Sequence, residues 1–496
     1  MWSAIRSVAV VAPVMLVAGS VACAGAPEAS PADPTPASRL LRVVDSVFGT
    51  PPLDRAHWGI EIVDLSTGAP ILRRNADRLF TVASNQKLIT MATALALLGP
   101  DYRYVTNLVA HDVADGVARS LVVHGSGDPT LSELFHDGPF AAIDSMADSL
   151  SAAGLRRVDG PLVVDQSRFD SALVHPAWQS FDLDWYYAAP VTAFAVARGA
   201  IPVRIAPGSR GAPADVELLV PEGLVRLDAA IGTVTGDRGW NDELERVPLA
   251  DSIRLRGTVG VAAVTDTALI AQLDPGDFAG RALAQALERQ GIEVAGPVLV
   301  RYTPAAEPAT RDGLLRTAWR SAPLISLVGV SLERSDNWLT EQVLKTIGAE
   351  RGDAGSWSAG TRVAERYLID SVGVAPGAVH LADGSGLATH NLATPGAVVL
   401  LLDHVRDQPW GVEFRAAMAE PGEEHSTLED RLAGLAGRLW AKTGTLRHVT
   451  ALSGYLRTED DRDLIFSIMT NASGQTGTTM REAVDRIVEA MTRTRN

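Results

Sequence analysis

The sequence has one cysteine and only three lysines in 496 residues. Cys23 lies near the N-terminus, so the rest of the chain has no partner for a disulfide and its stability must come from core burial. The lysines are Lys87, Lys345 and Lys442, and the other 41 of the 44 basic residues are arginine. Arginine stays protonated in proteins, whereas a buried lysine can lose its proton. We therefore expect this chain to keep lysine where arginine is unable to replace it.

Other absences exclude whole classes of function. The net charge is −15, and an acidic chain without a basic stripe is a poor partner for nucleic acid. The ten histidines show no metal-ligand spacing, since the nearest two, His380 and His390, are ten residues apart. No G-x-S-x-G sequence is present, which disfavours an α/β-hydrolase. We therefore expect no nucleic-acid partner, no metal and no cofactor.

Residues 1–26 are typical of an export signal, because their apolar run is too short for a membrane span and small residues follow it. Ala24-Gly25-Ala26 suits an ordinary signal peptidase. Ser20-Val21-Ala22-Cys23 instead resembles a lipoprotein box, which would place a lipid on Cys23 and attach the protein to a membrane. Both interpretations stay open, and in both residues 27–37 form a linker rich in Ser, Pro and Ala. We expect an exported protein, periplasmic or associated with the cell envelope.

Ser84 and Lys87 form an S-x-x-K sequence at the start of an apolar stretch that ends at Gly99. The apolar residues recur at helical spacing, so both side chains should lie on one face of the first turn of a buried helix. A serine hydroxyl is a poor nucleophile until a base takes its proton, and a lysine three residues further on can be that base. The simpler alternative is that Ser84 only caps the helix.

A second polar cluster, Ser335-Asp336-Asn337, opens a predicted helix that runs to Gly348. It places a hydroxyl and an amide at the N-terminal end of that helix. Taken alone, Ser335 is expected to be the helix N-cap. Lys345 lies further along the same helix, where we interpret it as a peripheral or structural cation.

A third cluster, Lys442-Thr443-Gly444-Thr445, precedes a predicted β-hairpin. It indicates a strand that carries a cation, a hydroxyl and then a glycine, which leaves the backbone accessible to a substrate at the strand edge. The simpler alternative is an ordinary edge strand whose lysine blocks aggregation.

Together, S-x-x-K, S-D-N and K-T-G are the signature of penicillin-binding proteins and class A β-lactamases. Ser335 follows Ser84 by 251 residues, a longer separation than compact β-lactamases have. The chain therefore resembles the D-alanyl-D-alanine carboxypeptidase/endopeptidase family of class C low-molecular-mass penicillin-binding proteins, which carries a large insertion between its first two motifs. The resemblance covers nearly all of residues 38–496. Further stretches that carry it are Gly127-Asp128-Pro129-Thr130-Leu131, Tyr186-Tyr187-Ala188-Ala189-Pro190 and Asp383-Gly384-Ser385-Gly386-Leu387.

The resemblance implies an α+β fold: a serine transpeptidase/β-lactamase-like domain in which helices flank an antiparallel sheet. This catalytic domain is split between residues 38–104 and 318–496. Residues 105–317 are the inserted part, whose short β-rich segments between glycines and prolines predict two small domains. An amphipathic helix from Arg481 to Met491 should close the chain against the sheet.

The resemblance also implies the catalytic roles. Ser84 is the nucleophile that forms an acyl-enzyme, and Lys87 takes its proton, which requires a lysine pKa lowered by burial or by a neighbouring cation. Ser335 relays a proton to the leaving amine. Asn337 holds Lys87 and the substrate amide.

The substrate-binding roles fall on the third motif. Lys442 supplies a positive field beside Lys87 and attracts the substrate carboxylate, which Thr443 binds. Gly444 keeps the strand edge open. The backbone N–H groups of Ser84 and Thr445 form the oxyanion hole.

The function that follows is a serine-type D-Ala-D-Ala carboxypeptidase, an endopeptidase or both, acting on peptidoglycan stem peptides or crosslinks and inhibited by penicillin and other β-lactams. Two alternatives stay open. A β-lactamase would share the acylation and deacylate fast, whereas a non-enzymatic penicillin-binding module of the cell wall would acylate and stop. The preferred diamino acid of the stem peptide and the oligomeric state are not contained in the sequence.

Overall fold

The computed structural model describes residues 36–246, 252–304 and 313–493. The predicted export signal, its lipoprotein box and most of the linker lie outside these ranges. Within them, no helix is both long enough and apolar enough to cross a membrane.

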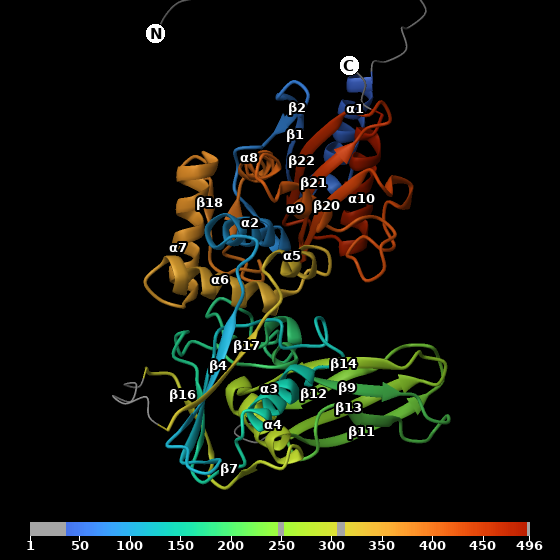
Figure 1. The fold of residues 1–496 in the computed structure, drawn as a ribbon. Helices are drawn as coiled ribbons and strands as arrows, with labels where there is room; N and C mark the ends of the chain where they lie inside the picture. Colours follow the sequence, from blue (N-terminus) through green and yellow to red (C-terminus); the bar gives the residue numbers. More distant parts are fainter. Residues whose placement is uncertain (1–35, 247–251, 305–312, 494–496) are drawn as a thin grey trace, which may run out of the picture. The chain divides into compact units, whose positions relative to one another are not determined.

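The first structural unit of this chain is a five-stranded antiparallel sheet with the order β2-β1-β22-β21-β20 (Figure 1). The sheet joins segments that are far apart in the sequence, because strand β1 pairs along its whole length with strand β22. Strand β20 has only one neighbour and is therefore an edge. The strands are β1 (His57–Asp64), β2 (Ala69–Arg74), β20 (Leu439–Leu446), β21 (Val449–Arg457) and β22 (Asp463–Asn471).

Helices cover both faces of this sheet, as predicted. Helices α1 (Pro36–Gly49) and α10 (Gly477–Met491) pack together on one face. Each is amphipathic, and the apolar side chains that it turns toward the sheet are buried. The prediction of a closing C-terminal helix is confirmed by the buried side chains of Val484, Ile487, Val488 and Met491.

The other face carries a larger helical layer, which lies on the opposite side of the sheet from α1 and α10 (Figure 1). Its centre is α2 (Gln86–Leu98), which is buried from Gln86 to Leu95 and packs against α6. The remaining helices of the layer are α5 (Ile325–Leu332), α6 (Asn337–Arg351), α7 (Trp357–Tyr367), α8 (Pro395–Arg406) and α9 (Gly411–Ala416). A small sheet beside them consists of β3 (Phe80–Thr81), β18 (Val379–His380) and β19 (Leu392–Ala393).

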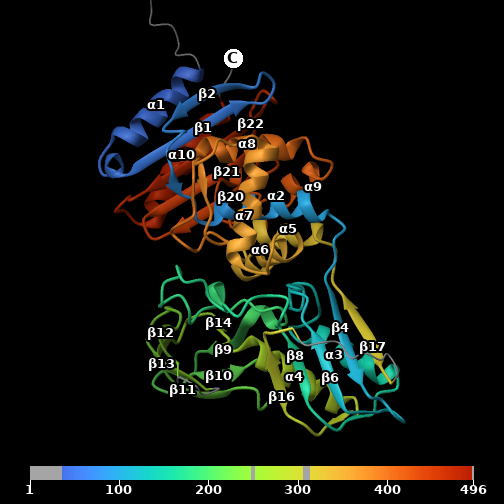
Figure 2. The same cartoon turned by 90° about the vertical axis from the view of Figure 1, so that its left-hand side faces the viewer.

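Between α2 and α5 the chain passes through a separate set of sheets. It enters through β4 (Val105–His111) and returns through β17 (Leu315–Arg320), and these two strands pair antiparallel. They belong to a mixed five-stranded sheet with the order β16-β8-β6-β4-β17 (Figure 2). This pairing supports our proposal that the inserted region is a distinct structural part of the chain.

The described part of the inserted region also has two α-helices and three smaller sheets. The helices α3 (Ala141–Ala152) and α4 (Pro275–Arg289) cover one face of the five-stranded sheet. The other strands of that sheet are β6 (Ser120–His124), β8 (Leu162–Asp165) and β16 (Val298–Arg301). The smaller sheets contain β5 (Val117–Ala118), β7 (Arg157–Val158), β9 (Ala200–Ala206), β10 (Asp215–Leu218), β11 (Arg226–Val234), β12 (Asn241–Arg246), β13 (Ser252–Gly260), β14 (Asp266–Ala271) and β15 (Glu293–Val294).

Candidate active site

Ser84 lies in a tight 3-10 turn, Ala83–Asn85, directly before helix α2. Ala83 has a φ of 48°, in the left-handed region that non-glycine residues rarely adopt. The turn is held from outside by Gly386, where an added Cβ would stand 1.8 Å from the carbonyl oxygen of Ala83. Only glycine fits there, so a segment far along the chain fixes the backbone that carries the serine.

Lys87 makes three hydrogen bonds from its buried side chain. Its Nζ donates to Ser84 Oγ at 3.0 Å, to Asn337 Oδ1 at 2.7 Å and to the carbonyl oxygen of Ser385 at 2.8 Å. The structure thus brings together Ser84, Lys87 and Asn337. The simpler interpretation of Ser84 as a helix cap is wrong, because no side chain caps α2 and the serine hydroxyl contacts the lysine instead.

Burial lowers the pKa of Lys87 to about 8, because the ammonium form loses its hydration inside the protein. The negative charges of Glu341, Asp383 and Asp336 oppose this shift without cancelling it. Of the two causes expected from the sequence, burial is therefore the one that acts on Lys87. At a pKa of about 8, roughly one lysine in ten is neutral at pH 7, against about one in a few thousand for an unperturbed lysine.

The three residues of the second motif, Ser335-Asp336-Asn337, have different contacts. Asp336, and not Ser335, is the N-cap of α6: its carboxylate accepts from the backbone N–H of Leu339 at 2.8 Å. The prediction that Ser335 caps the helix is therefore wrong, since the neighbouring carboxylate already satisfies that N–H. Ser335 instead has a φ of 63°, and within the described ranges its hydroxyl has no hydrogen-bond partner. Asn337, the first residue of α6, holds Lys87 with its oxygen and the carbonyl of Tyr187 with its amide nitrogen, at 2.9 Å.

The third motif lies on the edge strand β20. Lys442 is fully buried, and its pKa is well below the ordinary lysine value because of burial and then because of the charge on Lys87. Its Nζ donates to the carbonyl oxygen of Thr443 at 3.1 Å. Among the described residues, no hydrogen bond joins Lys442 Nζ to Ser84 or Ser335, and Lys87 is the charge that acts on it.

Gly444 has a packing role that the sequence did not predict. An added Cβ would stand 2.9 Å from Asn85 Nδ2 and 2.9 Å from the carbonyl oxygen of Val82. Asn85 also donates to the carbonyl of Lys442 at 3.2 Å. The glycine therefore lets the edge strand approach the turn that carries Ser84.

Two hollows meet at Ser335. One has a volume of about 320 Å³ and includes Ser84, Thr443 and Thr445, with Thr427, Arg431 and Arg481 on its rim. The other has a volume of about 290 Å³ and includes Asn337, Tyr186 and Tyr187. A substrate that reaches Ser84 thus has space on both sides of the partnerless Ser335 hydroxyl.

Sequence reasoning missed the groups that hold this arrangement. The Ser385 and Tyr187 carbonyls act through the backbone, which has no residue-type signature. Glu341 is fully buried, and its carboxylate accepts from the backbone N–H groups of Gly384 and Ser385 and from Trp357 Nε1. Burial and then the nearby charge of Asp383 raise the pKa of Glu341 to about 7, and these hydrogen bonds act against both. Helix α6 also carries Thr340, Gln342 and Lys345, so the sequence around Glu341 gave no signal of its burial.

Lys345 is part of the structure and not of the site. It is fully buried, donates to Asp170 Oδ1 at 2.8 Å and lies 3.9 Å from the centre of the Trp357 ring. Of the two interpretations made from the sequence, structural cation is correct and peripheral cation is not.

Comparisons with known proteins agree over nearly the whole chain. The sequence model of the D-Ala-D-Ala carboxypeptidase 3 (S13) family matches residues 40–491. A D-alanyl-D-alanine carboxypeptidase of Actinomadura sp. (strain R39) is 33% identical over 464 residues, which are 90% of this chain and 84% of that protein. The carboxypeptidase DacB of Mycolicibacterium smegmatis is 27% identical over 475 residues, 92% of this chain and 85% of that protein.

The fold is also found among solved structures. Penicillin binding protein 4 (dacB) of Haemophilus influenzae aligns with a TM-score of 0.76 and 19% sequence identity, over 91% of this chain and 98% of that one. This similarity confirms the predicted α+β fold.

Proposed function

The chain belongs to the D-Ala-D-Ala carboxypeptidase 3 (S13) family, and on that premise we propose that Ser84 is the nucleophile of a serine D-Ala-D-Ala carboxypeptidase acting on cell-wall stem peptides. The observation that carries the assignment is the meeting of three hydrogen-bond acceptors at one buried lysine nitrogen.

A neutral lysine amine has two N–H donors and one lone pair. Asn337 Oδ1 and the Ser385 carbonyl can only accept, so they take the two N–H groups of Lys87. The lone pair is then left for the hydroxyl of Ser84, 3.0 Å away. This arrangement aims the base at the nucleophile and supports Lys87 as the group that removes the serine proton.

The reaction then follows from the neighbouring groups. Ser84 Oγ attacks the carbonyl carbon of the penultimate D-alanine while its proton passes to Lys87. The C–N bond breaks, and the proton goes to the leaving amine of the last D-alanine through Ser335, whose hydroxyl has no other partner in the described structure. Water then hydrolyses the ester and restores Ser84 and the product carboxylate.

We propose that β20 binds the terminal carboxylate of the substrate. Thr443 and Thr445 line the same hollow as Ser84, and we assign Thr443 to the carboxylate and the backbone N–H groups of Ser84 and Thr445 to the oxyanion. Gly444 allows the strand to reach this position. Lys442, which is buried on the same strand, would act on the site through its charge, since it is near enough to Lys87 for the two charges to interact.

We also propose the binding partners and the cellular location of this protein. The substrates are peptidoglycan stem peptides, crosslinks between them, or both. A β-lactam complex of the Haemophilus influenzae protein is known, and we propose that penicillin acylates Ser84 here. The chain is exported to the cell envelope, with either a cleaved signal or a lipid on Cys23.

The test is mass spectrometry of the protein with and without benzylpenicillin, peptide mapping of any adduct, and an assay of D-alanine release from a pentapeptide stem. We expect a penicilloyl mass on the Ser84 peptide, D-alanine release by the wild type, and neither with Ser84→Ala. Ser66→Ala, in a surface turn, is the matched control.

Rapid turnover of a chromogenic β-lactam would instead indicate a β-lactamase. A stable adduct without D-alanine release would indicate a non-enzymatic module. An unmodified Ser84 would refute the nucleophile.

A further inference from the structure

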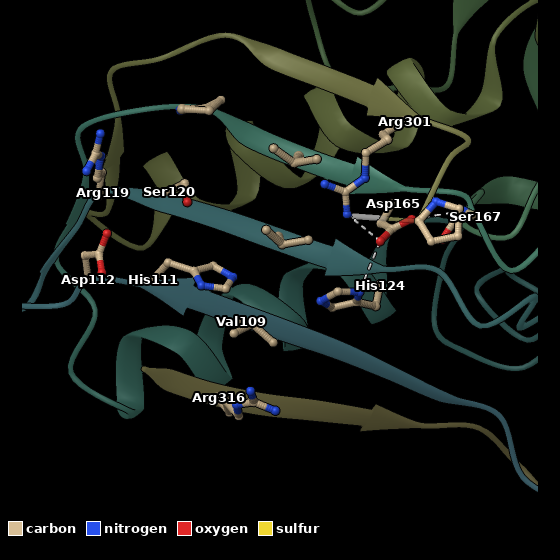
Figure 3. A pocket seen from close by; sticks show the side chains of 14 residues that line it. Val109, His111, Asp112, Arg119, Ser120, His124, Asp165, Ser167, Arg301 and Arg316 are labelled. Carbon is tan, nitrogen blue, oxygen red and sulfur yellow. Dashed lines mark hydrogen bonds and ion pairs between the residues drawn. The ribbon is translucent and has the colours of Figure 1, made fainter. Parts of the chain in front are cut away.

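The inserted region contains a hollow that the proposed chemistry does not use. It has a volume of about 620 Å³ and lies on the five-stranded sheet β16-β8-β6-β4-β17, on the face turned away from α3 and α4 (Figure 3). Small-molecule and peptide sites typically have volumes of about 300–1,000 Å³. This hollow shares no lining residue with either hollow beside Ser335.

The floor of the hollow is apolar. Strand register places Val109, Val122 and Val163 side by side on β4, β6 and β8. Val109 and Val122 are buried, although they point away from the helices that form the core on the opposite face. The three valines line the hollow, and the polar side chains around them cover much of their surface.

A polar row lies along one end of the floor. The register aligns His124, Asp165 and Arg301 on adjacent strands. Asp165 Oδ2 lies 2.6 Å from Arg301 Nη2 and 3.3 Å from His124 Nδ1, and Ser167 donates to the other carboxylate oxygen at 3.0 Å. Arg301 Nε is buried and has no hydrogen-bond partner among the described residues. Asp165 therefore engages part of the Arg301 guanidinium, and Nε lies inside the protein and not at the surface of the hollow.

The opposite end carries a second polar group. His111 pairs with Ser120 across β4 and β6, and Arg119 is next to Ser120 at the rim. Arg316 extends from β17 beside Val109. Figure 3 shows the two polar ends on either side of the valine floor.

Among the described lining residues of the hollow, arginines outnumber carboxylates. Its lining holds Arg119, Arg301 and Arg316 against two carboxylates, Asp112 and Asp165, and two histidines add to the positive side when protonated. The chain as a whole has a net charge of −15. Arginine pairs with carboxylates through its planar fork of donors, so a basic recess on an acidic protein favours an anionic ligand.

We infer that this hollow is a second binding site for the carboxylate-bearing stem peptide of a cell-wall strand, with the alanine methyl groups on the valine floor and the carboxylates at the arginines. The inference rests on the proposed function for the identity of the polymer. The site would hold the wall polymer while another stem peptide of the same polymer reaches Ser84, so the second contact gains from a high local concentration.

The experiment measures co-sedimentation of the full chain with purified cell walls, using Ser84→Ala so that no substrate is consumed. Arg119→Ala combined with Arg316→Ala tests the hollow. The matched control is Arg226→Ala combined with Arg289→Ala, which removes two exposed arginines from the same inserted region outside the hollow. We expect the apparent Kd to rise at least fivefold for the test pair and less than twofold for the control, and the wild-type binding to weaken with salt.

Treatments of the wall identify the group that is bound. Walls whose stem-peptide carboxylates have been amidated should lose the arginine-dependent binding, and walls stripped of phosphate polymers should keep it. Binding that survives amidation but is lost on stripping would overturn the inference in favour of a phosphate polymer. Equal binding by the test and control pairs would overturn it altogether, provided that both pairs keep the wild-type Tm.

The outcome is separable from that of the proposed function. With Ser84 intact, the test pair should release D-alanine from a soluble pentapeptide at the wild-type rate and should lose rate only on the polymer. If the wild type releases no D-alanine but its wall binding depends on Arg119 and Arg316, the proposed function fails and the binding site stands.

Discussion

The carboxylate of Glu341 accepts a 2.8 Å hydrogen bond from the backbone N–H of Ser385, the residue whose carbonyl oxygen accepts from Lys87. A buried acid on α6 therefore holds a backbone group that binds Lys87, the proposed base. The other carboxylate oxygen accepts from the backbone N–H of Gly384 and from Trp357 Nε1, so both oxygens of Glu341 are hydrogen-bonded.

Glu341→Gln should show that this is a positioning role. An amide in place of the carboxylate turns one N–H group toward a backbone donor, so we expect kcat to fall about 10- to 100-fold with little change in KM. The charge of Glu341 raises the pKa of Lys87, so its removal should also move the acid limb of the pH–rate profile to lower pH.

The pH–rate profile of Glu341→Gln is the decisive measurement. A purely structural defect would lower the rate at every pH without moving the acid limb of that profile. Glu365→Gln is the control, since Glu365 also accepts from a nearby backbone N–H, that of Leu381, and has no contact with Lys87. A limb that stays in place in Glu341→Gln would refute the coupling.

Lys87→Arg should abolish acylation. Arginine does not lose its proton in proteins, so it is unable to act as the base, and we expect the second-order rate of acylation by benzylpenicillin to fall by about 10²–10⁴-fold at every pH. In the wild type, a base with a pKa of about 8 should give a rate that rises with pH and levels off above that value. Acylation by Lys87→Arg at a near wild-type rate would show that Lys87 is not the base.

Gly444→Ala should push strand β20 away from the turn Ala83–Asn85, which carries Ser84. The new Cβ would stand 2.9 Å from the carbonyl oxygen of Val82, a backbone atom that has little room to move. Overpacking of this kind costs about 1–3 kcal/mol, and a displacement near 1 Å can cost about 10²-fold in rate. We expect a lower Tm and a loss of acylation. Gly434→Ala is the control, because nothing lies within 4 Å of its added Cβ, and equal activity of the two variants would contradict the close-approach argument.

Asp128 should make stability depend on pH. It is 3% exposed, and Thr130 donates to Oδ1 through both its N–H and its hydroxyl. Burial raises its pKa to about 6, and hydrogen bonding from Thr130 and from the nearby Trp319 side chain opposes that shift. A raised folded-state pKa means that the contribution to stability is complete below about pH 4 and is lost as pH rises through 6.

Asp128→Asn removes this titration. A shift of about two pKa units corresponds to roughly 3 kcal/mol, so the free energy of unfolding of the wild type relative to the variant should fall by about that amount between pH 4 and pH 7. Denaturant unfolding at each pH measures it. Asp115→Asn, an exposed position in the same region, is the control, and a difference that stays constant with pH would refute the argument.

Much of the chemistry was readable from the sequence. The scarcity of lysine singled out Lys87 and Lys442, and the helical spacing behind Ser84 predicted that Ser84 and Lys87 share one face. These predictions depend on residue type and on local backbone geometry, which neighbours in the chain determine. The flanked antiparallel sheet followed from the resemblance, and the closing helix from its own apolar spacing.

Other properties were decided only by tertiary structure. The lowered pKa of Lys87 depends on burial by segments about 250 and 300 residues away, and two of the groups that direct its proton, Asn337 and the Ser385 carbonyl, come from those segments. Gly386 and Gly444 are required because of what approaches them, which no local pattern shows. The sequence by itself determined which groups are present and in what order. Which of them are dehydrated, and which backbone atoms face them, depended on packing between distant parts of the chain, because both properties arise only when water is excluded between those parts.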